Sequence, residues 1–80
     1  MSIENKVKEI FKNVLDIPAE EIKPGDPLDT SLGMDSTEMV EITVAIKKEF
    51  NIADMENSDL KKNFSFNQIV TFLKQKGAAV

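Results

Sequence analysis

The sequence predicts an all-α protein: a small four-helix bundle with three longer helices, a short third helix and a long loop between helices one and two. Three stretches repeat apolar residues at helical spacing, and no stretch alternates apolar and polar residues as a half-buried strand does. The chain has 80 residues and contains no cysteine and no histidine. We therefore expect a single domain over residues 1–80, without disulfides, thiolate metal sites or a Ser-His pair.

The first helix is predicted from Ser2 to Asp16. Its apolar residues recur at spacings of four, three, one and three, which places them on one stripe: Ile3, Val7, Ile10, Phe11 and Val14. Ser2 can cap the start of this helix. Pro18 ends it, because the residue before a proline avoids the helical region.

The stretch from Pro18 to Asp35 is long for a connection between helices, and its prolines and glycines exclude one continuous helix. We expect a loop, with a single turn over Ala19 to Ile22. This stretch contains one basic residue, Lys23, and five acidic residues: Glu20, Glu21, Asp26, Asp29 and Asp35. Such a run is either a solvated loop that needs charge for solubility or a surface for partners with basic patches.

The second long helix is predicted from Ser36 to Phe50. Asp35 suits the N-cap, and Glu38 three residues later completes a capping-box pattern. On a helical wheel, one stripe faces the core; it comprises Met39, Ile42, Thr43, Ile46 and Phe50. Positions near about 200 degrees from Ser36 can face solvent; they are Glu38, Ala45 and Glu49.

A second, smaller apolar strip lies beside Ser36 on the same wheel. Val40, Val44 and Lys47 fall within about 80 degrees of Ser36. Just beyond them come the other members of the strip, Thr37, Glu41 and Lys48. Two interpretations stay open: the valines pack against the long loop, or they form a docking face beside the serine.

The signal is weaker between Asn51 and Asn63. A short third helix is predicted from Ser58 to Lys62, with Asn57 or Ser58 as its cap.

The last helix is predicted from Phe66 to Lys76. Ser65 and Gln68 form a second capping-box pattern, and Gly77 is a natural stop. The remaining residues, 78–80, are expected to form a frayed tail.

The charge and hydropathy of the chain indicate which classes of partner it suits. The net charge of −4 disfavours nucleic acid and favours proteins with basic patches. No apolar run has signal-peptide character or membrane-spanning length, so we expect no membrane insertion and a cytoplasmic location.

Several kinds of active site are excluded around Ser36. Without histidine, a serine nucleophile lacks its usual base, and no motif for a lysine base is present. The glycines are too scattered for a phosphate loop, the acids do not follow the EF-hand spacing, and no helix is basic enough to read DNA. Ser36 either faces water or is covalently modified. A phosphate ester at this position is favoured by the positive end of the helix.

The residues around Ser36 resemble the attachment motif of acyl carrier proteins. Leu32-Gly33-Met34 precedes Asp35-Ser36, and Thr37-Glu38-Met39-Val40-Glu41-Ile42 follows. The resemblance extends over nearly the whole chain, to the stretches 23–28, 48–50 and 64–73.

This resemblance implies a carrier, not an enzyme. A phosphopantetheinyl transferase would transfer 4'-phosphopantetheine from coenzyme A to Ser36, and the thiol of this cofactor would carry acyl groups as thioesters between enzymes of fatty-acid or related, polyketide-like biosynthesis. Asp35 and the second helix would dock the transferase and the acyl-transferring and synthase enzymes, which present basic patches. The docking residues would be those of the strip: Thr37, Val40, Glu41, Val44, Lys47 and Lys48. The carrier would act as a monomer, and the acyl chain would insert into the bundle core.

Three departures from the family pattern leave the cargo open. Thr37 stands where the family usually has leucine, and Lys47 and Lys48 stand where fatty-acid carriers often have acids. A housekeeping fatty-acid carrier and a specialised carrier with its own partner enzymes both fit. Two further alternatives are an aminoacyl carrier of the peptidyl or D-alanyl type and, from another class, an unmodified helical adaptor. Asp35 argues against the peptidyl type, which usually has histidine before the serine.

Overall fold

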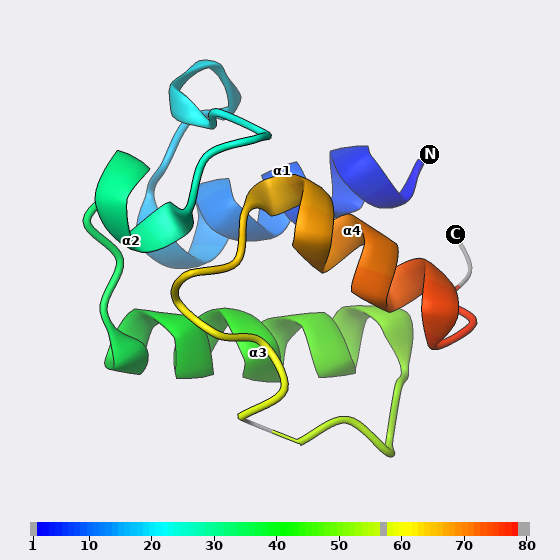
Figure 1. The fold of residues 1–80 in the computed structure, drawn as a ribbon. Helices are drawn as coiled ribbons and strands as arrows, with labels where there is room; N and C mark the ends of the chain where they lie inside the picture. Colours follow the sequence, from blue (N-terminus) through cyan, green and yellow to red (C-terminus); the bar gives the residue numbers. More distant parts are fainter. Residues whose placement is uncertain (1, 57, 79–80) are drawn as a thin grey trace.

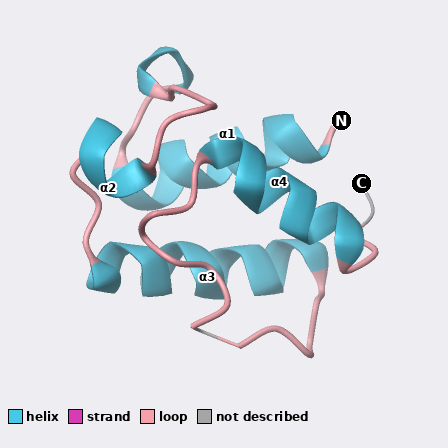
Figure 2. Ribbon diagram, viewed as in Figure 1, coloured by secondary structure: helices cyan, strands magenta, loops and turns pink. Residues whose placement is uncertain are grey.

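A computed structural model describes residues 2–56 and 58–78. Within these ranges the chain forms four α-helices and one 3-10 turn, joined by loops, and no strand (Figures 1 and 2). The elements are α1 (Ile3–Leu15), η1 (Ala19–Glu21), α2 (Leu28–Ser31), α3 (Ser36–Phe50) and α4 (Phe66–Gln75). The predicted all-α bundle is confirmed, although its short helix lies elsewhere in the chain.

The ends of α1 follow the predicted signals. The Ser2 side chain accepts a hydrogen bond from the Asn5 backbone N–H. At the other end Asp16 takes the left-handed conformation, with φ of 57°, and its N–H donates to the Lys12 carbonyl. The Lys12 ammonium donates to Asp16 Oδ1 at 2.9 Å, and this bond lowers the pKa of the Asp16 carboxyl.

The core is formed where α1 contacts both α3 and α4. Phe11 of α1 meets Phe66 of α4 edge to face, with ring centroids 6.0 Å apart. The predicted stripe of α3 is buried as expected: Met39, Ile42, Thr43, Ile46 and Phe50. Of the positions expected to face solvent, Glu49 is exposed, but Ala45 is half-buried and packs against the core.

The predicted loop between the first two long helices contains the helix α2. Pro27 precedes it, the Ser31 N–H donates to the Pro27 carbonyl, and the Thr30 hydroxyl donates to the same oxygen. Leu28 is fully buried and anchors the helix in the core. The expected single turn is confirmed as η1. A four-residue helix with one apolar anchor leaves no periodic pattern, so the sequence does not reveal it.

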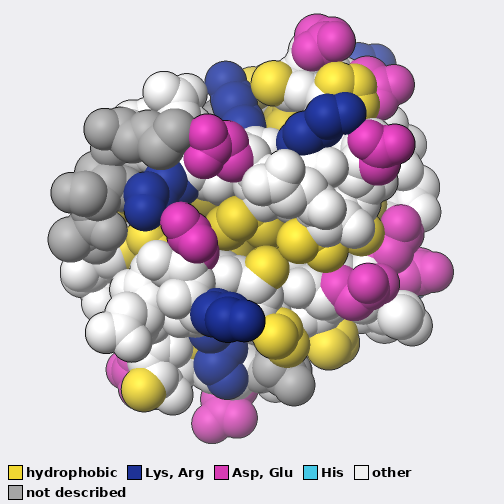
Figure 3. Space-filling model, turned by 180° about the vertical axis from the view of Figure 1, so that it is seen from behind, with side chains coloured by type: hydrophobic (Ala, Val, Ile, Leu, Met, Phe, Trp, Pro, Cys, Tyr) yellow, Lys and Arg dark blue, Asp and Glu magenta, His cyan; other side chains and the backbone are white. Residues whose placement is uncertain are grey.

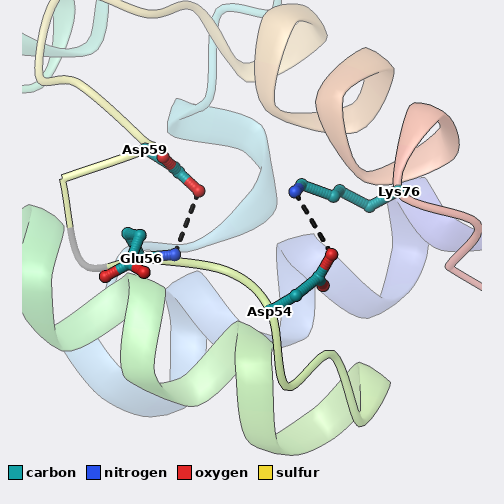
Figure 4. Close-up of polar contacts among 4 residues, drawn as sticks. All are labelled: Asp54, Glu56, Asp59 and Lys76. Carbon is teal, nitrogen blue, oxygen red and sulfur yellow. Dashed lines mark hydrogen bonds and ion pairs between the residues drawn. The ribbon is translucent and has the colours of Figure 1, made fainter.

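The predicted helix from Ser58 to Lys62 is wrong, since the described part of the segment between α3 and α4 forms turns and bends. Asp59 closes one turn, because its carboxylate accepts from the Glu56 N–H and its own N–H donates to the Glu56 carbonyl (Figure 4). The Lys62 carbonyl accepts a hydrogen bond from the Asp29 N–H, so it does not take part in a local helical hydrogen bond. The alternative cap at residue 57 lies outside the described residues.

The segment between α3 and α4 is held in place by buried side chains and by an ion pair to the end of α4. Ile52, Met55 and Leu60 are buried and form part of the core. The Lys76 ammonium reaches Asp54 at 3.5 Å from the end of α4 (Figure 4). The loop is therefore anchored to the core by its side chains rather than by regular structure.

The last helix begins and ends close to its predicted bounds. Ser65 and Gln68 form the predicted capping box, in which each side chain accepts a hydrogen bond from the other residue's backbone N–H. The predicted frayed tail is wrong at Ala78, because its N–H donates to the Leu73 carbonyl and its side chain packs against the core. Residues 79–80 lie outside the described ranges. Of the helices described, none has the length and apolar character to cross a membrane.

Candidate functional site

The start of α3 is built by two reciprocal hydrogen bonds. Asp35 Oδ1 accepts from the Glu38 N–H at 2.8 Å, and Glu38 Oε1 accepts from the Asp35 N–H at 3.1 Å. This is the predicted capping box. It explains why Glu38, expected to face solvent, is only half-exposed: its side chain folds back to the cap.

The chain reaches this cap through a short turn after α2. Gly33 takes a positive φ of 67°, which other residues adopt only with strain. Met34 is buried, and its N–H donates to the Leu28 carbonyl at 3.3 Å. Leu28 before Gly33 and Met34 after it are both buried, and together they set where α3 begins.

Ser36 is the first residue of α3, and its side chain is exposed. Its hydroxyl takes no part in the capping box, which is made by Asp35 and Glu38. The serine therefore presents an oxygen to the outside at the positive end of a fifteen-residue helix.

An open groove of about 380 Å³ lies beside this serine. Its apolar part comes from Met39 and Val40 of α3 and from Leu60 of the following segment. Its polar lining, besides Ser36, consists of Ser58, Lys61 and Lys62. The groove therefore offers both polar and apolar side chains to a ligand beside the serine.

The second wall of the groove depends on contacts between distant parts of the chain. The Asp29 N–H donates to the Lys62 carbonyl and the Leu28 N–H to the Phe64 carbonyl, both at 2.9 Å. These bonds tie the segment before α4 to α2, which ends at Ser31, one short turn before Ser36. Lys61 and Lys62 were missed by sequence reasoning because no local pattern indicates this return of the chain.

The strip beside Ser36 stays on the outside. Val40 is 40% exposed and Val44 is 51% exposed, and the loop between α1 and α3 contributes no residue to the groove that Val40 lines. Both valines therefore keep much of their surface outside the core, as a docking face requires. Other members of the strip are also exposed, namely Thr37, Glu41 and Lys48, whereas Lys47 is half-buried.

The molecular surface places apolar side chains among charged ones. On the face opposite to that of Figure 1, hydrophobic side chains form a band, and acidic side chains gather along one edge of it (Figure 3).

The groups around Ser36 suit covalent modification of its hydroxyl rather than catalysis by it. It offers an exposed primary hydroxyl, a helix end that stabilises a phosphate ester, two ammonium groups and an apolar groove. These groups fit a phosphate-linked arm with a polar beginning and an apolar cargo. They define a small helical protein that carries a prosthetic arm.

Comparisons with known proteins identify that class. The family model described as "Phosphopantetheine attachment site" matches residues 5–73. An acyl carrier protein of Nitratidesulfovibrio vulgaris (strain Miyazaki F) is 32% identical over 76 residues, which cover 95% of this chain and 99% of the relative. An acyl carrier protein of Clostridium acetobutylicum is 36% identical over 69 residues, covering 86% of this chain and 88% of the relative. No solved structure matches the chain.

The chain belongs to the acyl carrier protein family. It is a carrier rather than an enzyme, its cofactor is a covalently attached 4'-phosphopantetheine, and it works with a phosphopantetheinyl transferase and with biosynthetic enzymes. The resemblance inferred from the sequence is thereby confirmed at the level of the family.

We predict that Asp35→Ala lowers the free energy of unfolding by about 1 kcal/mol, because the α3 cap loses its acceptor for the Glu38 N–H. Urea unfolding of the unmodified protein, followed by circular dichroism, measures this change. Asp35→Asn is the matched control, since it keeps a capping oxygen and should cost only a few tenths of a kcal/mol. Equal stability of the alanine variant and the parent would contradict the structural role of the cap.

Proposed function

We propose that Ser36 is the attachment point of the 4'-phosphopantetheine arm and that the protein is a single acyl-carrier domain, acting as a cytoplasmic monomer. The observation that supports this most strongly is the exposed Ser36 hydroxyl at the capped start of α3, beside an open groove. When attached, the arm supplies a thiol that holds acyl groups as thioesters. The residues of the chain have a different task, which is to present the hydroxyl, bind partners and shelter the cargo.

Asp35 has a double role in this proposal. Its Oδ1 caps α3 and so orients the first turn that bears Ser36. The capping bond is made through Oδ1, so Oδ2 can meet a cation supplied by the transferase, either a metal ion or a lysine. Because the chain has no histidine, the proton of the Ser36 hydroxyl is expected to pass to a base of the transferase.

We assign partner docking to the exposed strip of α3. Val40 and Val44 supply apolar contact area close to the serine, and Glu41 supplies a negative charge just beyond them. Lys47 and Lys48 place positive charge towards the far end of the helix. A partner that fits this face has a basic patch near its active-site entrance and an acidic patch about three helical turns away.

The carried acyl chain is expected to lie in the groove beside Ser36. Met39, Val40 and Leu60 provide its apolar lining, and Met39 and Leu60 also border the core. An acyl chain entering there would be shielded from water and would add apolar contacts to the folded state.

We predict that Ser36→Ala abolishes the gain in mass that follows incubation with a broadly acting phosphopantetheinyl transferase and coenzyme A. Intact-protein mass spectrometry measures this gain. Ser58→Ala is the matched control, because Ser58 also lines the groove and is also exposed, and it should gain mass as the parent does. Arm attachment that persists in Ser36→Ala would refute the assignment, and an unmodified parent would favour the helical adaptor.

We predict that Glu41→Lys reduces kcat/KM of the transferase for the carrier by about threefold or more, because a favourable charge contact becomes a repulsive one. Initial rates at low ionic strength measure the change. Glu9→Lys makes the same charge reversal at an exposed site on α1 and should leave the rate near that of the parent. Equal losses in both variants would show that net charge alone matters and would contradict a docking face on α3.

We predict that loading the arm with an octanoyl group raises the melting temperature by about 4 °C or more relative to the form with the bare thiol. About 1 kcal/mol produces such a shift in a domain of this size, and burial of a few methylene groups supplies it. The acetyl-loaded protein is the control, since its chain is too short to fill the groove. Equal melting temperatures of the octanoyl and acetyl forms would show that the cargo stays in solvent.

A further inference from the structure

Two lysines lie on the groove that contains Ser36. Lys61 and Lys62 both line it, and both are exposed. The ion pairs found among the described residues use other lysines, namely Lys6, Lys12, Lys74 and Lys76. Two positive charges beside the serine are therefore available to a ligand.

The backbone holds these lysines in place. The Lys62 carbonyl accepts from Asp29, and the Lys61 carbonyl accepts from the Phe64 N–H at 3.0 Å. Leu60, the residue before the pair, is 2% exposed and fixes the segment to the core. The fold therefore fixes the backbone positions of both lysines beside the groove, whereas their long side chains can adopt different rotamers.

Ser36 needs positive charge if it bears a phosphate. Asp35 precedes it, and Glu38 and Glu41 follow within two turns of α3, so a phosphodiester here adds a negative charge to an acidic cluster. The helix end compensates only in part, because the Glu38 N–H is already bonded to the Asp35 carboxylate. Lys61 and Lys62 are the cations that share a groove with the serine.

We propose that Lys61 and Lys62 bind the phosphodiester of the arm on Ser36 and thereby direct the start of the arm along the groove. This inference rests on the proposed attachment at Ser36. The same oxyanion chemistry would also suit a carboxylate at the far end of a dicarboxylic acyl group. The two sources of the anion are separated below by loading the arm with different groups.

The test compares unmodified and arm-bearing protein in three forms: the parent, Lys61→Gln/Lys62→Gln and Lys23→Gln/Lys74→Gln. The third form is the matched control, since it removes the same charge from two exposed lysines that lie neither on the groove nor on the docking strip of α3. Intact-protein mass spectrometry first establishes that each form carries the arm. An unmodified parent would refute the attachment itself, whereas a modified one allows the lysines to be tested.

The measured quantity is the change in melting temperature on attachment of the arm at low ionic strength. In the parent and the control, attachment is expected to leave the melting temperature unchanged or higher. In Lys61→Gln/Lys62→Gln, the uncompensated phosphate should lower it by about 2 °C or more, and added salt should remove the difference. The phosphorus-31 chemical shift should depend on salt in the parent and the control but not in this variant.

An identical response of all three forms, in melting temperature and phosphorus shift, would overturn the proposal. The arm is then loaded with succinyl or butyryl groups, which differ in a terminal carboxylate. A lysine-dependent effect confined to the succinyl form would also overturn the assignment, because the lysines would then bind the cargo and not the phosphodiester. If the double variant does not fold, Lys61→Gln and Lys62→Gln are measured singly, with half the effect expected of each.

Discussion

The structure depends on the reciprocal hydrogen bonds between Asp35 and Glu38 that begin α3. They fix the first turn of the longest helix, and so they decide where the Ser36 hydroxyl lies and which face of α3 turns inward. The same helix then buries Ile42 and Ile46 and leaves Val40 and Val44 outside. The cap thus sets where α3 begins, and the apolar pattern of the helix sets which face packs into the core.

The groove beside Ser36 has a different origin, since it needs two distant segments to meet. The carbonyls of Lys62 and Phe64 accept hydrogen bonds from the start of α2 (Asp29 and Leu28), which brings the segment before α4 alongside the start of α3. Ser36, an apolar lining and a lysine pair thereby become neighbours. In the function proposed above, the arm, its charge and its cargo each have a place in this arrangement.

Much of the fold and part of the site could be predicted from the sequence. The three long helices have clear periodicity and clear caps, so Ser2, Asp35 and Ser65 were recognised as helix starts. The short helix was predicted in the wrong loop because neither segment has a periodic pattern, and long-range hydrogen bonds decide their conformations. Lys61 and Lys62 could not be connected to Ser36 for the same reason: their proximity comes from tertiary structure, which local sequence does not encode.

The attachment of the arm to Ser36 is tested most directly by fragmenting the modified protein in a mass spectrometer and locating the added group. We expect the added mass on every fragment that contains Ser36 and on none that lacks it. Location of the group on another hydroxyl residue, such as Thr37 or Ser58, would contradict the assignment. It would also remove the reason for placing a phosphate between the start of α3 and the lysine pair.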